Sequence, residues 1–283
     1  MASSLPRRIA VAAVGIPLVA LLVFLGGWPL VLALQLLAVL GTWEVYRLAA
    51  VRGVVPLAVL GYLAAAAAPV AVYAAVIPGV SARWLAFLAA AWVILVMMGA
   101  VRRRAPDQQP LAAVAVTVFG PVYTAVLPSF ILYLRHGGPY DAMGHTALVF
   151  LPLIVTWICD TAAMTGGAVF GGPKFAPVVS PNKTWSGTIT GSLAGTAVAV
   201  LYGWQVLARV DIDLTWWKLA VIGFVLAGLG QVGDLAESLF KREAGVKDSG
   251  TFFPGHGGVL DRLDSLYWVL PAAAVLLTAW RVL

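Results

Sequence analysis

The chain has 283 residues, of which 61% are hydrophobic and 11% are charged, and its mean hydropathy is +0.95. This apolar content is well above that of soluble domains and excludes an ordinary soluble globular protein. The formal charge of +6 would suit a nucleic-acid partner in a soluble protein. In a membrane protein, basic residues gather in cytoplasmic loops, so we expect no nucleic-acid partner. The single cysteine, Cys159, excludes an internal disulfide bond and is typical of a small apolar filler in a helix.

Apolar stretches long enough to cross a hydrocarbon core of about 30 Å recur throughout the sequence. They predict an all-α, polytopic integral membrane protein in which residues 1–283 form a single transmembrane domain, with the motif-rich half at about 150–283. The first stretch follows Arg7 and Arg8, but it is longer than the apolar region of a signal peptide, so we expect a retained helix. The nine predicted spans are 9–27, 29–48, 55–78, 84–101, 111–134, 146–170, 187–208, 216–238 and 265–281.

The basic residues are distributed unevenly between the two sides of these spans. With the N-terminus in the cytoplasm, thirteen of the 18 lysines and arginines fall on the cytoplasmic side and five on the other. The positive-inside rule therefore predicts a cytoplasmic N-terminus. We expect a protein of the bacterial inner (plasma) membrane whose charged motifs face the cytoplasm. Arg102–Arg104 are typical of topology determinants that also contact anionic lipid heads. The segment 43–47, with Trp43, Glu44, Tyr46 and Arg47, is typical of an interfacial belt with one charged pair.

The predicted span 216–238 ends in two acids on one helix face, Asp234 and Glu237, which are three residues apart. Acids at membrane depth are costly and typical of functional sites. For Glu237, a helix end entering water, where a carboxylate is simply solvated, is an equal alternative.

The following segment, 241–265, holds eight charged residues in a chain that is only 11% charged. Its glycines allow backbone N–H groups to approach an anion closely around His256. Asp261 and Asp264 open the last span with Arg262 between them, a place where acids also suit the helix dipole. Carboxylates beside basic residues and a glycine turn are what a site for Mg²⁺ and a polyphosphate needs. The basic residues are Lys241, Arg242 and Lys247, and the glycines are Gly255, Gly257 and Gly258.

A third polar segment runs from Asp160 to Gly187. Asp160 lies inside the span 146–170, where an unpaired charge is expensive, so it predicts a polar site; a protonated packing residue is the alternative. The glycines at 166–172 also suit tight helix packing. Ser180 and Lys183 precede a helix N-terminus that can bind phosphate. Capping of that helix by Ser180 or Thr184 is the competing interpretation.

Two of these segments carry recognisable motifs. Ser238-x-Phe240-Lys241-Arg242, Lys247-Asp248 and Pro254-x-His256-Gly257-Gly258-Val259-x-Asp261-Arg262-Leu263-Asp264 together resemble the signature of the phosphatidate cytidylyltransferase (CDP-diacylglycerol synthase) family. The segment 160–187 resembles the family's upstream motif, Ser-Pro-Lys-Lys-Thr-Trp-Glu-Gly, except that Asn182 and Ser186 replace a lysine and the glutamate. The resemblance covers the second half of the chain.

The resemblance implies transfer of a cytidylyl group from CTP to phosphatidic acid, which gives CDP-diacylglycerol and pyrophosphate for phospholipid synthesis. It also implies a requirement for Mg²⁺, a helical membrane fold, contact with membrane lipids and a homodimer. We expect Asp234 and Asp261 to hold the metal. The residues expected to act in catalysis are Asp234, Asp261, Lys241, Arg242 and His256, and those expected to bind substrate are Lys247, Asp248, Gly257, Gly258, Arg262, Asp264, Asp160, Ser180 and Lys183.

Two other functions compete with this interpretation. An ion-coupled membrane transporter would use Asp160 and Asp234 as coupling groups, which explains the intramembrane acids but not the charged, glycine-rich segment. A lipid kinase would use ATP in place of CTP.

Overall fold

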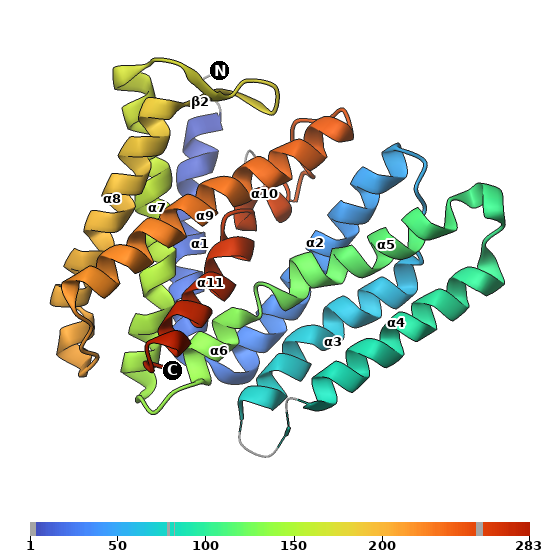
Figure 1. Cartoon of the computed structure of the whole chain (residues 1–283), viewed down its shortest axis with the longest axis horizontal. Coiled ribbons are helices and arrows are strands. Elements are labelled where there is room, and N and C mark those ends of the chain that lie inside the picture. Colours follow the sequence, from blue (N-terminus) through green and yellow to red (C-terminus); the bar gives the residue numbers. More distant parts are fainter. Residues whose placement is uncertain (1–3, 78–79, 82, 253–256) are drawn as a thin grey trace. The chain divides into compact units, whose positions relative to one another are not determined.

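The computed structural model describes the chain except for residues 1–3, 78–79, 82 and 253–256, and it describes side chains from residue 13 onward. Most of the described residues lie in helices (Figure 1), which confirms the predicted helical membrane fold. Two short strands, β1 (Lys174–Ala176) and β2 (Ser180–Thr184), form an antiparallel pair that the sequence did not predict. The α-helices are α1 (Ser4–Leu25), α2 (Gly27–Val51), α3 (Ala58–Val76), α4 (Arg83–Arg103), α5 (Pro110–Pro121), α6 (Phe130–His136), α7 (Ala142–Phe170), α8 (Trp185–Gln205), α9 (Trp216–Glu243), α10 (Leu260–Leu263) and α11 (Leu266–Ala279). The 3₁₀- and π-helical turns are η1 (Pro106–Gln108), η2 (Val122–Val126) and η3 (Leu207–Val210).

Seven helical segments of the described chain are long and apolar enough to cross a membrane. The prediction of a polytopic integral membrane protein is therefore confirmed, but the count of nine spans is not. The part of α1 whose side chains are described, Ala13–Leu25, and the 14-residue α11 are both shorter than the roughly 20 residues that a membrane-crossing helix needs. The seven segments are Gly27–Val51, Ala58–Val76, Arg83–Arg103, Pro106–His136, Ala142–Phe170, Trp185–Val210 and Trp216–Glu243.

The chain forms two compact units. The first consists of Met1–His136 and Glu243–Arg262, and the second of Gly137–Arg242 and Leu263–Leu283. The charged segment after α9 therefore belongs with the N-terminal helices, although it is far from them in the sequence. Whether the chain is the single domain that we expected stays a prediction.

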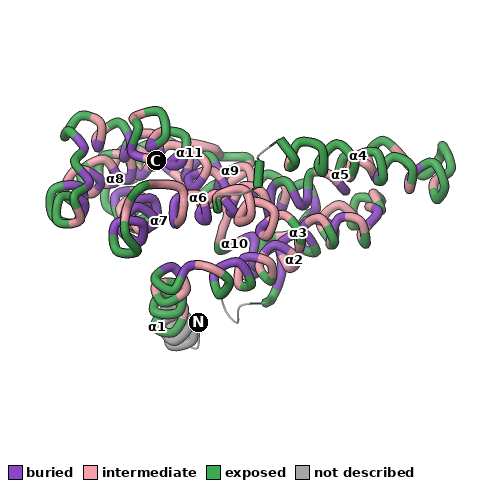
Figure 2. Tube along the Cα trace, turned by 90° about the horizontal axis from the view of Figure 1, so that it is seen from below, coloured by how far each residue is buried: buried purple, intermediate pink, exposed green. Residues whose placement is uncertain are grey.

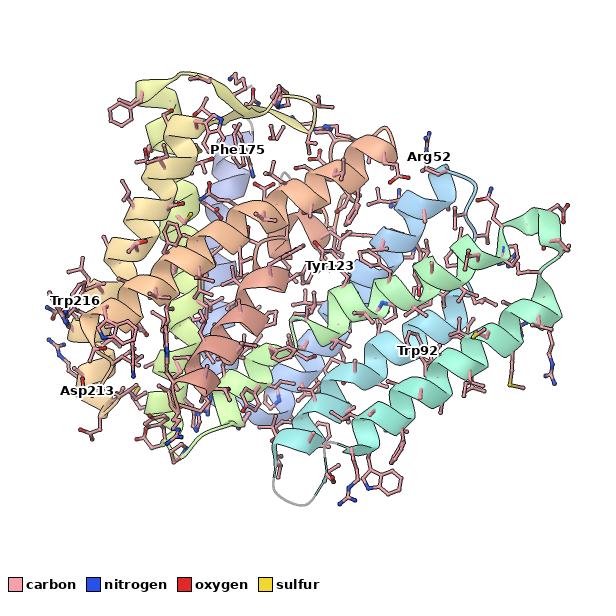
Figure 3. The ribbon with its side chains drawn as sticks, viewed as in Figure 1. Arg52, Trp92, Tyr123, Phe175, Asp213 and Trp216 are labelled. Atoms are coloured by element: carbon pink, nitrogen blue, oxygen red, sulfur yellow. The ribbon has the colours of Figure 1, made fainter. Side chains whose placement is uncertain are left out.

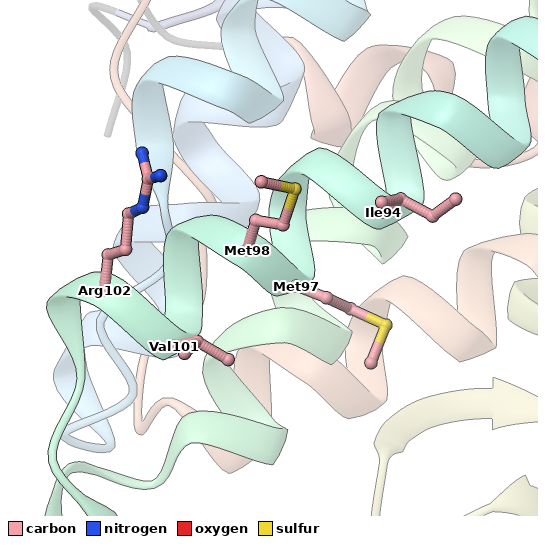
Figure 4. Close-up of a pocket in the computed structure, with 5 residues that line it drawn as sticks. All are labelled: Ile94, Met97, Met98, Val101 and Arg102. Carbon is pink, nitrogen blue, oxygen red and sulfur yellow. The ribbon is translucent and has the colours of Figure 1, made fainter.

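In the first unit, α4 presents a largely exposed apolar surface. Most of this helix is exposed (Figure 2), and only Val96 and Ala100 in it are buried. The indole N–H of Trp92, labelled in Figure 3, donates to the Leu60 carbonyl oxygen (3.1 Å) and ties α4 to α3. Apolar exposure of this extent suits contact with lipid chains. A hollow of about 390 Å³ lies on α4 (Figure 4), and it is lined by Ile94, Met97, Met98, Val101 and Arg102.

The same unit contains a buried polar seam around Tyr46 of α2. This side chain fills the space beside Gly61 and Gly120, and its hydroxyl donates to the Thr117 carbonyl oxygen (2.8 Å). Tyr46 is 3% exposed, so the interpretation of this residue as part of an interfacial belt is wrong. The physical reason is that small residues on α3 and α5 leave room for an aromatic ring within the helix bundle.

In the second unit, a row of small residues on α8 brings the helices close together. A buried small residue recurs at every fourth position over most of the helix, which is the small-xxx-small pattern of membrane helix contacts. A Cβ atom at Gly191 would lie 2.9 Å from the Ala163 Cβ and 3.2 Å from the Cys159 Sγ of α7. Cys159 is buried in this contact, which agrees with its expected role as a filler. The row is Gly187, Gly191, Gly195, Ala199 and Gly203.

We therefore expect Gly191→Ala to destabilise the second unit by about 1–3 kcal/mol, because the added methyl group must push α7 and α8 apart. Gly228→Ala on α9 is the matched control, since no heavy atom lies within 4 Å of the added Cβ. The measurement is the midpoint of denaturant unfolding of the purified chain in detergent. Equal midpoints for the two variants would contradict the packing argument.

Candidate active site

An ion pair in the second unit brings together two of the predicted site residues. The Nζ atom of Lys183 in β2 lies 2.6 Å from the Oδ2 atom of Asp234 in α9. Lys183 Nζ also donates to the carbonyl oxygen of Gln231 (3.5 Å), and the Ser238 hydroxyl donates to Asp234 Oδ1 (3.4 Å). The side chains of Lys183 and Asp234 are 25% and 36% exposed, so a ligand in solvent can reach both.

Local sequence explains how Lys183 reaches this position. The chain leaves α7 through Gly171 and Gly172, whose φ angles of 59° and 97° lie in the left-handed region that favours glycine. It then forms the β1–β2 pair, in which Phe175 packs edge-to-face on Trp185 with ring centroids 4.7 Å apart. Thr184 caps α8 by accepting a hydrogen bond from the Gly187 N–H (3.2 Å), which confirms the capping alternative for that residue. Ser180 lies in β2 and is not the cap.

Two further predicted acids belong to the same cluster. Asp160 of α7 is exposed, and it interacts electrostatically with Asp264, Asp234 and Lys183. Gly233 allows a close approach to the chain at Asp264, since a Cβ atom there would lie 2.7 Å from the Asp264 carbonyl oxygen. Burial and, after it, the charge of Asp234 raise the pKa of Asp264 to about 6, against the lowering effect of a hydrogen bond from the Ser265 N–H. The cluster thus concentrates negative charge where a cation is favourable.

Glu237 and Lys241 form a second, more buried ion pair on α9. Their Oε1 and Nζ atoms are 3.2 Å apart, and the two side chains are 0% and 10% exposed. The interpretation of Glu237 as a solvated helix-end acid is therefore wrong, because α9 stays packed past its apolar stretch. Arg242, one residue further, is exposed, and its Nε donates to the Val179 carbonyl oxygen (3.3 Å), which holds the β1–β2 segment against α9.

In the first unit, Asp261 organises the loop that follows α9. Its Oδ2 atom accepts hydrogen bonds from the Ser249 N–H (2.9 Å), the Ser249 hydroxyl (2.9 Å) and the Gly258 N–H (2.8 Å). Gly257 has a φ angle of 82°, and a Cβ atom there would collide with the Asp261 carboxylate. The anion that the glycine backbone approaches in this structure is a side chain of the protein itself, and binding of a substrate phosphate by these glycines stays a prediction.

A residue that the sequence did not identify, Glu44 of α2, binds the same loop. Its carboxylate accepts hydrogen bonds from the Val259 N–H (3.0 Å) and the Leu260 N–H (2.8 Å), and its Oε2 atom lies 3.0 Å from the Ser249 hydroxyl, whose single hydrogen it shares with Asp261. We interpreted Glu44 as half of a charged pair in an interfacial belt, and the structure shows that this was wrong, since the side chain is 0% exposed. The one signal available was an acid in a largely apolar helix.

The remaining predicted residues are less constrained in the described structure. Lys247, Asp248 and Arg262 of the first unit are exposed. His256 lies outside the described residues. Asp234 lies in the second unit and Asp261 in the first, so the predicted metal pair is divided between the units.

The donor chemistry of the cluster fits Mg²⁺, a hard cation that prefers carboxylate oxygens. Among the described residues, no group of three or more His, Cys, Asp and Glu side chains could hold a metal ion unaided. This agrees with the usual behaviour of Mg²⁺, which is bound by one or two carboxylates together with substrate phosphates rather than by a protein cage.

Comparison with known proteins places the sequence of this chain in a family. Residues 6–280 match the profile of the cytidylyltransferase family. A phosphatidate cytidylyltransferase from Brucella suis is 47% identical over 137 residues, which are 48% of this chain and 47% of that protein. A phosphatidate cytidylyltransferase from Staphylococcus haemolyticus is 44% identical over 129 residues, or 46% and 48% of the two chains. The chain thus spans about half the length of the curated relatives that it matches. Because the family profile extends over nearly the whole sequence, the chain belongs to the cytidylyltransferase family.

Proposed function

We propose that the protein transfers a cytidylyl group from CTP to phosphatidic acid in the membrane, releasing pyrophosphate and producing CDP-diacylglycerol. The observation that carries the proposal is the acid–lysine cluster of Asp160, Lys183, Asp234 and Asp264 in a chain of the cytidylyltransferase family. The matched relatives named as phosphatidate cytidylyltransferases support the choice of lipid substrate.

This reaction asks the protein for positioning and electrostatic stabilisation. The phosphate of phosphatidic acid is already a nucleophile, so no side chain needs to be activated to attack the α-phosphorus of CTP. The protein has to align the two phosphates and stabilise the charge of the departing pyrophosphate. Lys183, whose side chain is partly exposed, and the basic residues Lys241, Arg242 and Lys247 are proposed to bind phosphate oxygens. His256, Gly257 and Gly258 are proposed to shape the nucleotide site, with Asp248 and Arg262 beside them.

We propose that Asp234 and Asp261 hold Mg²⁺ together with the phosphates of CTP. The ion neutralises phosphate charge that the lysines and arginines alone would leave uncompensated. Asp160 and Asp264 add negative charge beside Asp234. The Ser180 hydroxyl is proposed to donate a hydrogen bond to a phosphate oxygen.

We further propose that these groups face the cytoplasm, where CTP is available, and that the membrane is the bacterial inner membrane. The helices begin and end close to the predicted spans, so the uneven distribution of basic residues still favours this orientation. Contacts in the first unit agree with it. Arg104 donates to the Val55 carbonyl oxygen (2.8 Å), and both residues have the predicted cytoplasmic position. Arg135 donates to the Val23 carbonyl oxygen (2.8 Å), and both residues are predicted on the side opposite the cytoplasm. The homodimer remains a prediction of the family resemblance.

The proposal is tested with purified protein, labelled CTP, phosphatidic acid and Mg²⁺, followed by separation of the lipid products. We expect labelled CDP-diacylglycerol, and its formation should stop when EDTA removes the divalent ion. A protein that moved ions across vesicle membranes without consuming CTP would instead be the ion-coupled transporter, an alternative that the comparisons do not support. A protein that used ATP and gave a phosphorylated lipid would be a kinase.

A further inference from the structure

Glu44 is a fully buried acid in a membrane helix, and its carboxylate is hydrogen-bonded by the protein itself. Its Oε1 atom accepts from the Val259 N–H, and its Oε2 atom accepts from the Leu260 N–H and lies 3.0 Å from the Ser249 hydroxyl. All three groups belong to the segment 249–260, the loop and the first residue of α10, at separations of 205 to 216 residues from Glu44. Burying a carboxylate is expensive unless donors replace water, and here donors from a single loop do so.

The contacts of Glu44 and Asp261 meet at one residue of that loop, Ser249. The Ser249 hydroxyl is 3.0 Å from Glu44 Oε2 and 2.9 Å from Asp261 Oδ2. The Ser249 and Gly258 N–H groups both donate to Asp261 Oδ2. Through these hydrogen bonds, the two carboxylates hold Ser249, at the start of the loop, next to the segment 258–261 at its end.

The glycines of the loop are fitted to the same carboxylate. A Cβ atom at Gly250 or at Gly258 would collide with Glu44 Oε1, and one at Gly258 would also collide with the Ser249 hydroxyl. Both glycines are buried. The backbone at Gly250 and at Gly258 thus passes directly over the Glu44 carboxylate, which leaves little freedom for these two positions to move while the contacts persist.

We propose that Glu44 is a positioning residue for cytidylyl transfer: from the membrane helix α2, it holds the loop that carries Asp261, Gly257 and Gly258 in the conformation that the reaction requires. This inference rests on the proposed function. Glu44 acts through the loop and touches no substrate. Its effect is therefore expected mainly in kcat, because a misplacement of about 1 Å in catalytic groups can cost about a hundredfold in rate.

The test compares Glu44→Gln with Glu243→Gln, which makes the same chemical change at an exposed position next to the loop. Glutamine has one oxygen and one NH₂ group, so in Glu44→Gln an amide donor must face either the Val259 or the Leu260 N–H. Hydrogen exchange of the full chain in detergent should become about tenfold faster at these two amides, and exchange in α8 should be unchanged. The kcat should fall by about a hundredfold with little change in the KM for CTP. Glu243→Gln should match the unmodified protein in hydrogen exchange, in kcat and in the KM for CTP.

Ser249→Ala provides the second variant, which is needed if Glu44→Gln does not fold. It removes one of the three groups that contact Glu44 and should raise exchange in the segment 249–261 by a smaller factor. The effects of Glu44→Gln and Ser249→Ala on kcat should be less than additive, because both changes break the same contact. Unchanged loop exchange in Glu44→Gln, or additive effects, would overturn the inference. If the unmodified protein makes no CDP-diacylglycerol while Glu44→Gln still shows faster exchange in the loop, the proposed function is refuted and the attachment of the loop by Glu44 stands.

Discussion

Asp234→Asn is expected to lower the rate of CDP-diacylglycerol formation by about a hundredfold or more. The substitution removes the negative charge that lies 2.6 Å from Lys183 Nζ and that is proposed to hold Mg²⁺. Loss of one preorganised electrostatic group in an active site typically costs about 10²–10³ in rate. Stability should barely change, because an ion pair with side chains 25% and 36% exposed contributes only about 0–1 kcal/mol.

The measurement is the initial rate at saturating CTP and Mg²⁺, together with the unfolding midpoint of each variant. Asp213→Asn is the matched control. Asp213 is an exposed acid in the same unit, just before α9, and it is labelled in Figure 3. The Asp213→Asn variant should retain the full rate of CDP-diacylglycerol formation. Full activity in Asp234→Asn would remove the metal assignment of this residue.

Asp261→Asn is expected to reduce the rate by a similar factor while leaving the loop folded. The asparagine side chain can turn its carbonyl oxygen toward the Ser249 N–H, the Ser249 hydroxyl and the Gly258 N–H, which now donate to Oδ2. The variant therefore keeps the acceptor but loses the charge. This separates a role in holding Mg²⁺ and phosphate from a role in shaping the loop.

Hydrogen exchange of the Ser249 and Gly258 amides reports on the loop, and the initial rate reports on the charge. We expect near-normal exchange with a strongly reduced rate. Asp107→Asn, at an exposed acid in η1 of the same unit, should change neither quantity. A normal rate would show that Asp261 serves the loop alone. Rapid exchange at both amides would show that the three hydrogen bonds need the charge.

Much of the fold could be predicted from the sequence because membrane-crossing helices are local features. Apolar runs of the required length identify α2 to α4 and α7 to α9 directly. The β1–β2 pair could not be predicted in this way, because Ser180–Thr184 contains proline and lysine and has no strand-like alternation. Its two strands are joined by the turn at 177–179.

The sequence identified those residues of the candidate site that stand out from their neighbours in the chain, but not the contacts between residues far apart in the sequence. Lys183 was singled out because it precedes a helix N-terminus and Asp234 because it lies in an apolar run, and the structure joins them in one ion pair. The partners of Glu44 are 205 to 216 residues away, so nothing near it in the sequence indicates that its carboxylate is satisfied within the protein. Glu237 was ambiguous for a related reason, since its burial depends on how far α9 stays packed.

The most direct test of the proposed reaction uses CTP labelled either at the α-phosphate or at the γ-phosphate. In the presence of Mg²⁺ and phosphatidic acid, the α-label should enter the lipid fraction and the γ-label should appear only in pyrophosphate, with none in lipid. Transfer of the γ-label to lipid, or release of both labels without a lipid product, would contradict the account.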